Sequence, residues 1–220
     1  MRTIVILNSK GGVGKSNITR HLAVAAEQES PGKVIMCDTD PQGSLSEWWN
    51  SRLSETPPLA VISVTEFPEK QPVLAGRFDY LFFDTAAADA KQYGDILKSV
   101  DLIVIPVVPS PDDVRSLNRL TLPVIKISGR PFIFVLSKAR LATQLLVSTM
   151  SALSEHGTVC PTIIQQREGY AKAAFAGSTL LEDEPGGKGA EEIRKLWEFV
   201  KSRIDEKTTL SQKTKGLLHV

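Results

Sequence analysis

The chain has 220 residues, of which 42% are hydrophobic, which is enough to bury the core of one α/β domain without a second domain. Its formal net charge of +1 excludes a strongly basic protein, so any binding to nucleic acid would have to come from a local positive patch. Cys37 and Cys160 lie in apolar runs without metal-ligand spacing, and we expect core cysteines of a reducing compartment rather than a disulfide. The chain shows no signal-peptide pattern and no apolar run of about 18 residues, so we expect a soluble, cytoplasmic protein without a membrane partner.

Short apolar runs alternate with longer helical patterns along the whole chain. The runs occupy residues 3–8, 33–38, 59–64, 78–84, 101–107, 131–137 and 159–164. This alternation is typical of βαβ units, and runs that are apolar on both faces favour parallel strands covered by helices on each side. We therefore predict a single-domain α/β fold with a doubly wound, mostly parallel sheet, and ligands outside the carboxyl ends of its strands.

Three further segments give expectations about organisation. Residues 54–72 carry four prolines and few helix formers, so this stretch is expected to be rich in loops around one short strand. Residues 191–203 combine an apolar stripe with exposed basic residues and predict a helix. The polar residues 205–220 show no clear period, so we expect one domain over residues 1–204 followed by a flexible tail over 205–220.

A glycine-rich loop follows the first strand and carries the strongest functional signal. It reads Ser9-Lys10-Gly11-Gly12-Val13-Gly14-Lys15-Ser16, and Asn17 continues into a predicted helix over residues 17–27. Backbone N–H groups of such a turn and helix N-terminus converge on one anion, and the glycines let the backbone approach phosphate. Lys15 would reach the β- and γ-phosphates of a nucleotide and the Ser16 hydroxyl would ligate Mg²⁺, although Ser9 stands where the general pattern has glycine.

Carboxylates end two of the predicted strands on the side where this loop opens. The second strand ends in Asp38-Thr39-Asp40-Pro41-Gln42-Gly43, and the fourth ends in Asp84 at a Walker B position. Mg²⁺ is usually held by one or two carboxylates and several waters, and hydrolysis needs a group that orients the attacking water. A capped turn that opens the next helix at Asp40-Pro41 is the alternative for the first of these motifs.

Together these motifs resemble the deviant Walker A box, the A′ box and the Walker B strand of the ParA/MinD family, closest to short plasmid ParA-like (ParF-type) partition ATPases. The resemblance covers nearly the whole chain, and it includes the proline-rich segment from Ile105 to Asp113, which in the family lies near the nucleotide and the dimer interface. It implies a P-loop ATPase that uses ATP and Mg²⁺, forms an ATP-sandwich homodimer, binds DNA nonspecifically, and is stimulated by a ParB/ParG-like centromere-binding partner. Association with the nucleoid in the ATP-bound state is implied as well. The basic residues of the helix over 191–203, Arg194, Lys195, Lys201 and Arg203, are candidate DNA contacts, and an ordinary solvated charged face is the alternative.

The resemblance also implies roles for single residues. Lys10 corresponds to the signature lysine that reaches the partner's nucleotide, so that Lys10, Lys15 and Asp40 would be catalytic, with Asp40 positioning the water. Ser16, Asp38 and Asp84 would serve the metal. The loops containing Arg140, Gln165 and Arg167 match regions that frame adenine in the family, but solvated arginines or DNA contacts remain an equal alternative for Arg140 and Arg167. The family usually has a proline-containing turn after the Walker B strand, and residues 85–88 depart from it.

Several rival interpretations share the same nucleotide motifs. A MinD-like membrane switch would need an amphipathic C-terminal helix, and the apolar residues of the tail lack helical spacing. A relative that positions another cargo, such as a conjugation complex, a chemotaxis array or a microcompartment, cannot be separated from a partition ATPase by these motifs. A metabolic enzyme of the dethiobiotin-synthetase or nitrogenase-iron-protein type is disfavoured because no further substrate motif or cysteine pair is visible. On the helix after the A′ box, Trp48 and Trp49 indicate core and interface contacts rather than cofactor stacking.

Overall fold

The computed structural model describes residues 1–87 and 90–217, with side chains described up to residue 206. One seven-stranded sheet has the order β3-β2-β4-β1-β5-β6-β7, and every neighbouring pair is parallel. The strands are β1 Arg2–Ile6, β2 Val34–Asp38, β3 Leu59–Val61, β4 Tyr80–Asp84, β5 Leu102–Val107, β6 Phe132–Leu136 and β7 Thr158–Val159. All seven predicted strands are present, and the predicted doubly wound parallel sheet is confirmed, although the last strand has only two residues.

The helices connect these strands and continue beyond the last one. On the chain before β5 they are α1 Lys15–Glu29, α2 Ser44–Asn50, α3 Phe67–Ala75, the 3₁₀ turn η1 Ala90–Tyr93 and α4 Gly94–Leu97. After β5 come α5 Pro111–Ser116, the π-helical segment η2 Leu117–Thr121, α6 Leu122–Ser128 and α7 Gln144–Ser154. The last group comprises α8 Glu168–Phe175, α9 Leu180–Asp183 and α10 Lys188–Leu217.

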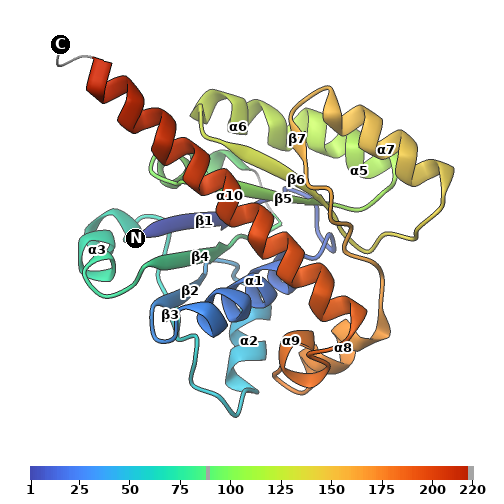
Figure 1. Cartoon of the computed structure of the whole chain (residues 1–220), viewed down its shortest axis with the longest axis horizontal. Helices are drawn as coiled ribbons and strands as arrows, with labels where there is room; N and C mark the ends of the chain where they lie inside the picture. The colour runs from blue at the N-terminus through green and yellow to red at the C-terminus, as the bar shows by residue number, and fades with distance from the viewer. Residues whose placement is uncertain (88–89, 218–220) are drawn as a thin grey trace.

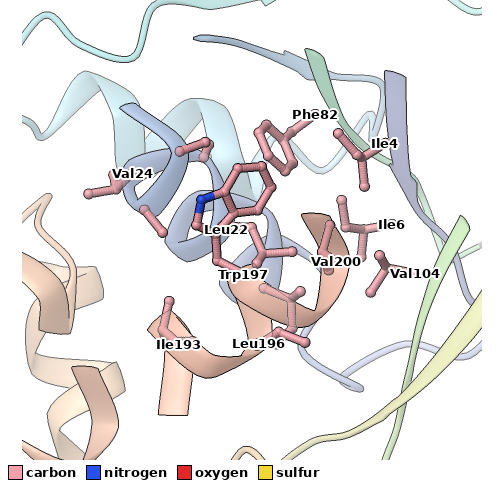
Figure 2. Packing of buried hydrophobic residues seen from close by; sticks show 14 of the residues in the cluster. Ile4, Ile6, Leu22, Val24, Phe82, Val104, Ile193, Leu196, Trp197 and Val200 are labelled. Carbon is pink, nitrogen blue, oxygen red and sulfur yellow. The ribbon is translucent and has the colours of Figure 1, made fainter. Parts of the chain in front are cut away.

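The sheet separates two hydrophobic clusters, one under each layer of helices. Alternate residues of one strand belong to different clusters: Ile4 and Ile6 of β1 face one layer, and Val5 faces the other. The first layer is formed by α1, α2, α8, α9 and α10, and α10 runs across it in Figure 1. In this layer Trp197 of α10 packs among Leu22, Phe82 and neighbouring aliphatic side chains, as Figure 2 shows. Burial of both sheet faces explains why the central strands are almost continuously apolar.

Two expectations about organisation are corrected by the structure. The proline-rich stretch ends in helix α3, which begins at Phe67, holds Pro68 in its first turn and tolerates Pro72 inside. Proline in the first turn removes no intrahelical hydrogen bond, so proline content alone did not exclude a helix. The C-terminal helix runs from Lys188 to Leu217 rather than over residues 191–203, and Figure 1 shows it continuing past the edge of the sheet. The division at residue 204 stays a prediction.

The structure also shows where the cysteines and tryptophans singled out in the sequence lie. Cys37 and Cys160 are buried and free. Trp48 is buried and donates through Nε1 to the Ser178 carbonyl at 2.9 Å, and Trp49 is half-buried against the same core. Across residues 1–87 and 90–217, no helix combines the length and apolar composition that crossing a membrane requires. Ala88, part of the unusual turn after the Walker B strand, lies outside the described residues.

Candidate functional site

The glycine-rich loop lies at the carboxyl end of the central strand β1, between its neighbours β4 and β5. Gly12 and Gly14 have φ values of 75° and 92°, in the left-handed region where a side chain would be strained. Gly14 is the N-cap of α1, so the loop turns directly into the helix N-terminus. The Val13 carbonyl is anchored by the Ser137 hydroxyl at 2.6 Å. The loop therefore presents the backbone of a helix N-terminus at the sheet edge, which is a favourable place for a phosphate group.

The two lysines of the loop have different environments. Lys15 is buried, and its Nζ donates to the Lys10 carbonyl at 3.3 Å. Burial lowers the pKa of the Lys15 ammonium, and this effect is opposed by Asp84 and Asp40. Lys10 instead points its Nζ to Asp113 Oδ2 at 2.5 Å. The Lys15 ammonium thus lies inside the loop, whereas the Lys10 ammonium contacts a carboxylate of α5.

Asp113 is fixed by the start of α5. The Ser110 side chain caps this helix by accepting from the Asp113 N–H at 3.1 Å, and its hydroxyl donates back to Asp113 Oδ2 at 2.6 Å. The Asp113 side chain is only 6% exposed, whereas that of Lys10 is 35% exposed. The same helical run contacts the loop again, because Ser9 N–H donates to Thr121 Oγ1 at 3.2 Å. The helical run formed by α5 and η2 therefore positions two side chains, Asp113 and Thr121, against the beginning of the phosphate loop.

Asp84 ends β4 beneath the phosphate loop and is fully buried. Its Oδ1 accepts from the Thr19 hydroxyl at 3.2 Å, while its Oδ2 has no partner among the described residues. Burial raises the pKa of Asp84 to about 7, against the lowering effects of Ser16, Lys15 and Thr19. A buried carboxylate oxygen without a partner is costly, and a divalent cation or its water would satisfy it. Asp84 and Ser16 together fit an Mg²⁺ site.

Asp38 and Asp40 extend this acidic edge from β2, the strand beside β4. Asp38 pairs in register with Asp84 across the two strands. Its carboxylate is already used locally, since Oδ1 accepts from Asp40 N–H at 3.0 Å and Oδ2 from Ser46 N–H at 2.9 Å and Ser46 Oγ at 2.7 Å. Asp40 is half-buried, and its Oδ1 accepts from Gln42 N–H at 2.9 Å. Asp38 therefore organises the turn into α2, and Asp40 keeps free acceptor capacity towards the loop.

A cavity of about 330 Å³ opens beside Gly14 and Asn17 and continues away from the phosphate loop. Its wall includes Lys138, Gln165 and Arg167, so two of the residues predicted to frame a base are brought to one cavity. Arg140 is not among the lining residues. A nucleoside attached to phosphates in the loop would enter this cavity.

Gln165 and Arg167 both donate hydrogen bonds to Glu192, a residue that no sequence motif identified. Glu192 of α10 accepts from the Gln165 backbone N–H at 3.2 Å and from Gln165 Nε2 at 2.8 Å. Arg167 donates to the same carboxylate through Nη2 and Nε. Hydrogen bonding to Glu192 raises the pKa of the Arg167 guanidinium. Through Glu192, the two side chains connect their loop to α10. Nothing in the sequence distinguishes Glu192 from the other acidic residues of its helix.

The ion pair between Asp113 and Lys10 could not be predicted from the sequence either. The pattern from Ser110 to Asp113 is a recognisable helix start, with a capping serine, a proline in the first turn and an acidic residue three positions later. That pattern gives the helix boundary but carries no information about Lys10, which is 103 positions away. The pair forms because α5 follows β5, the strand beside β1, so that both residues lie at the same edge of the sheet.

The fold and this loop define a P-loop nucleotide-binding protein, with the ligand at the carboxyl edge of a doubly wound parallel sheet. Residues 4–180 match the family model described as the CobQ/CobB/MinD/ParA nucleotide binding domain, and the chain belongs to this family. The predicted relationship to ParA/MinD-type proteins is thereby confirmed. As a member of this family, the chain is an ATPase that uses ATP and Mg²⁺.

The chain is also similar to individual proteins in sequence and in fold. The chain is 27% identical over 220 residues, covering 93% of this chain and 94% of the relative, to the maintenance of carboxysome distribution protein A of Gloeobacter kilaueensis. Its fold is similar to MinD in the MinC:MinD cell division complex of Aquifex aeolicus, with a TM-score of 0.76, 17% identity and coverage of 92% and 96%. It is also similar to the septum site-determining protein MinD of Pyrococcus horikoshii complexed with Mg-ADP, with a TM-score of 0.72, 20% identity and coverage of 90% and 95%.

Proposed function

We propose that this chain is a positioning ATPase whose output is an ATP-dependent homodimer. The observation that carries the proposal is the ion pair between Lys10 and Asp113. The ammonium of Lys10 belongs to the phosphate loop by sequence, yet its Nζ contacts a carboxylate on α5 rather than the neighbouring loop backbone. A lysine held in this way can exchange its partner for a phosphate without any change in the loop that binds the nucleotide.

In this proposal the residues of the site have distinct roles. Gly11 to Ser16 with Asn17 hold the phosphates, Lys15 contacts the β- and γ-phosphates, and Ser16 with Asp84 holds Mg²⁺, assisted by Asp38. Asp40 orients the attacking water, because its carboxylate is half-buried and keeps acceptor capacity beside its hydrogen bond from Gln42 N–H. Lys10 leaves Asp113 and stabilises the nucleotide of the second subunit, where its charge offsets the charge on the transferring phosphate.

ATP binding then favours the dimer, and hydrolysis favours the separate subunits. We propose that the ATP-bound dimer associates with nonspecific DNA, and hence with the nucleoid, and that a partner protein stimulates hydrolysis. The carried object is DNA, recognised through a ParB/ParG-like centromere-binding protein, or a protein cargo. The second option is supported by similarity to a protein named for carboxysome distribution over 93% of this chain.

The test is the ATPase rate of the full chain, measured alone, with nonspecific duplex DNA, and with a candidate partner protein. A positioning ATPase should turn over slowly alone and faster with DNA and partner together. Purified centromere-binding proteins and cargo-adaptor proteins encoded near this chain are tested separately, and the one that accelerates hydrolysis identifies the cargo. A high rate that is indifferent to every addition would instead indicate a metabolic enzyme.

A further inference from the structure

Charge is distributed very unevenly along this nearly neutral chain. Between Asp113 and Glu155 there is no acidic residue. The same stretch contains six basic residues, namely Arg115, Arg119, Lys126, Arg130, Lys138 and Arg140. Because the whole chain carries a net charge of only +1, the rest of the protein is net acidic. Four of the six lie on or just after the helical segments α5, η2 and α6, whereas Lys138 and Arg140 lie in the loop between β6 and α7. Helices α5 and α6 lie together in Figure 1.

One continuous helical run, α5-η2-α6 from Pro111 to Ser128, carries half of these basic residues on its outer face. Arg115, Arg119 and Lys126 are exposed on this run, with the π-helical segment Leu117–Thr121 between the first and the last of them. Arg130 follows just after the helix and is partly exposed. Arg115 pairs with Asp112 at 3.6 Å, whereas Arg119, Lys126 and Arg130 have no carboxylate partner among the described residues. These three unpaired residues are called the basic stripe below.

The inner face of the same run contacts the phosphate loop. Asp113 and Thr121 are buried, and they bind Lys10 and Ser9. Thr121 lies in the π-helical segment η2, and such segments are common at functional sites. The run thus joins the nucleotide loop on one side to the basic stripe on the other. A change in the partner of Lys10 would therefore remove a contact of the helical run that carries the stripe.

We propose that the basic stripe, Arg119, Lys126 and Arg130, binds the phosphate backbone of double-stranded DNA, and that contacts of its helix with Ser9 and Lys10 make this binding depend on ATP. The inference rests on the proposed function and locates its DNA surface. Unpaired exposed cations bind phosphates by releasing counterions, without reading sequence. Arginine is the better phosphate ligand, and two of the three residues are arginine.

Helix α10, the other basic helix, is a weaker candidate because its charges are balanced or paired. Lys195 contacts Glu191 at 2.6 Å, Lys201 contacts Glu29 at 2.6 Å, and Arg203 contacts Glu206 at 2.7 Å. An anionic membrane is the rival partner for the stripe, since Leu120 and Ile127 are exposed beside it. Interfacial helices, however, use a broad apolar face with aromatic residues, and the stripe has no aromatic neighbour on its own run.

The experiment measures binding of the full chain to a fluorescent nonspecific duplex with Mg-ATP or Mg-ADP over a range of salt concentrations. The variant Arg119→Ala/Lys126→Ala/Arg130→Ala removes the stripe. Lys188→Ala/Arg194→Ala/Lys195→Ala removes the same number of exposed charges from α10 and is the matched control. None of the six residues lines the nucleotide cavity, so the unstimulated ATPase rate and ATP-dependent dimerisation of both variants should equal those of the wild type.

We expect tight binding by the wild type only with Mg-ATP. The stripe variant should lose at least about tenfold in affinity, with a salt slope shallower by about 2 to 3, whereas the control stays within about threefold. Equal losses in both variants, or none in the stripe variant, would overturn the proposal while leaving ATP-driven dimerisation untouched. Failure of the wild type to bind DNA would also overturn it, and stripe-dependent sedimentation with anionic phospholipid vesicles would then identify a membrane as the partner. A wild type that does not dimerise with Mg-ATP would count against the proposed function itself.

Discussion

At the scale of single residues, the Lys10–Asp113 pair is well suited to be exchanged. The Lys10 side chain is 35% exposed, so water can solvate its ammonium when it leaves the carboxylate. Asp113 is buried but keeps the hydrogen bond from Ser110 at 2.6 Å when the lysine leaves. A γ-phosphate, which carries more charge than a carboxylate, can therefore compete for Lys10.

Asp84 gives a prediction about pH at the same scale. Its pKa is about 7 in the folded protein and 3.8 in the unfolded chain, so between these values only the folded state keeps the proton. The free energy of unfolding of the metal-free protein should therefore fall as pH rises from about 4 to about 7. Asp84→Asn should remove this part of the slope, which urea titrations near both ends of the window would measure. Identical pH profiles for the wild type and the variant would contradict the assignment.

Magnesium binding should show the opposite dependence. The Asp84 carboxyl must lose its proton to hold the cation, so Mg²⁺ affinity in the presence of ADP should fall about tenfold per pH unit below about pH 7. Calorimetric titration of the ADP complex with Mg²⁺ at several pH values would measure this. An affinity that does not change with pH across this window would mean that Asp84 is already ionised.

The sequence was sufficient to locate most residues of the site but not their partners. Lys15, Ser16, Asp38, Asp40 and Asp84 could be placed at one sheet edge because parallel strands end together. The contacts of Lys10 with Asp113 and of Arg167 with Glu192 could not be predicted, since each joins elements far apart in the chain. Such contacts depend on how α5 and α10 cross the sheet, which local patterns do not encode.

At the scale of elements, the strands were predicted better than the helices that lack a regular pattern. Continuous apolar runs identified every strand, but α3 was hidden by its prolines and the length of α10 by its polar second half. A helix of 30 residues does not need an apolar stripe throughout, because its packed part can support the rest. In α10 the packed part ends at Ile204, the last of its core residues among the described side chains.

This difference along α10 leads to a prediction about stability. Trp197 is 2% exposed, packs against Phe82 and donates to Glu29 at 3.0 Å, so Trp197→Ala should destabilise the fold by about 3–5 kcal/mol. Truncation after Ile204 leaves the core contacts of α10 intact and should change the free energy of unfolding by less than about 1 kcal/mol. Guanidinium unfolding of both variants would measure the difference. A truncated chain as unstable as Trp197→Ala would show that the domain extends beyond residue 204.

At the scale of the whole molecule, the site is arranged so that nucleotide hydrolysis changes association. Asp40 lies at the loop edge with one backbone contact, so Asp40→Ala should leave ATP binding and the fold intact while slowing hydrolysis by about two orders of magnitude or more. The variant should accumulate as the ATP-bound dimer, which size-exclusion chromatography with light scattering would detect. Normal turnover by this variant would remove Asp40 from the catalytic role.

The most direct test of the account is the molecular mass of the wild type, Lys10→Ala and Lys15→Ala in the presence of a non-hydrolysable ATP analogue and Mg²⁺. The wild type should reach twice the 24.0 kDa of the single chain. Lys15→Ala should remain at 24.0 kDa because it no longer binds nucleotide, whereas Lys10→Ala should remain there although it still binds the analogue. A Lys10→Ala protein that dimerises as fully as the wild type would contradict the claim that Lys10 leaves Asp113 to join the second subunit.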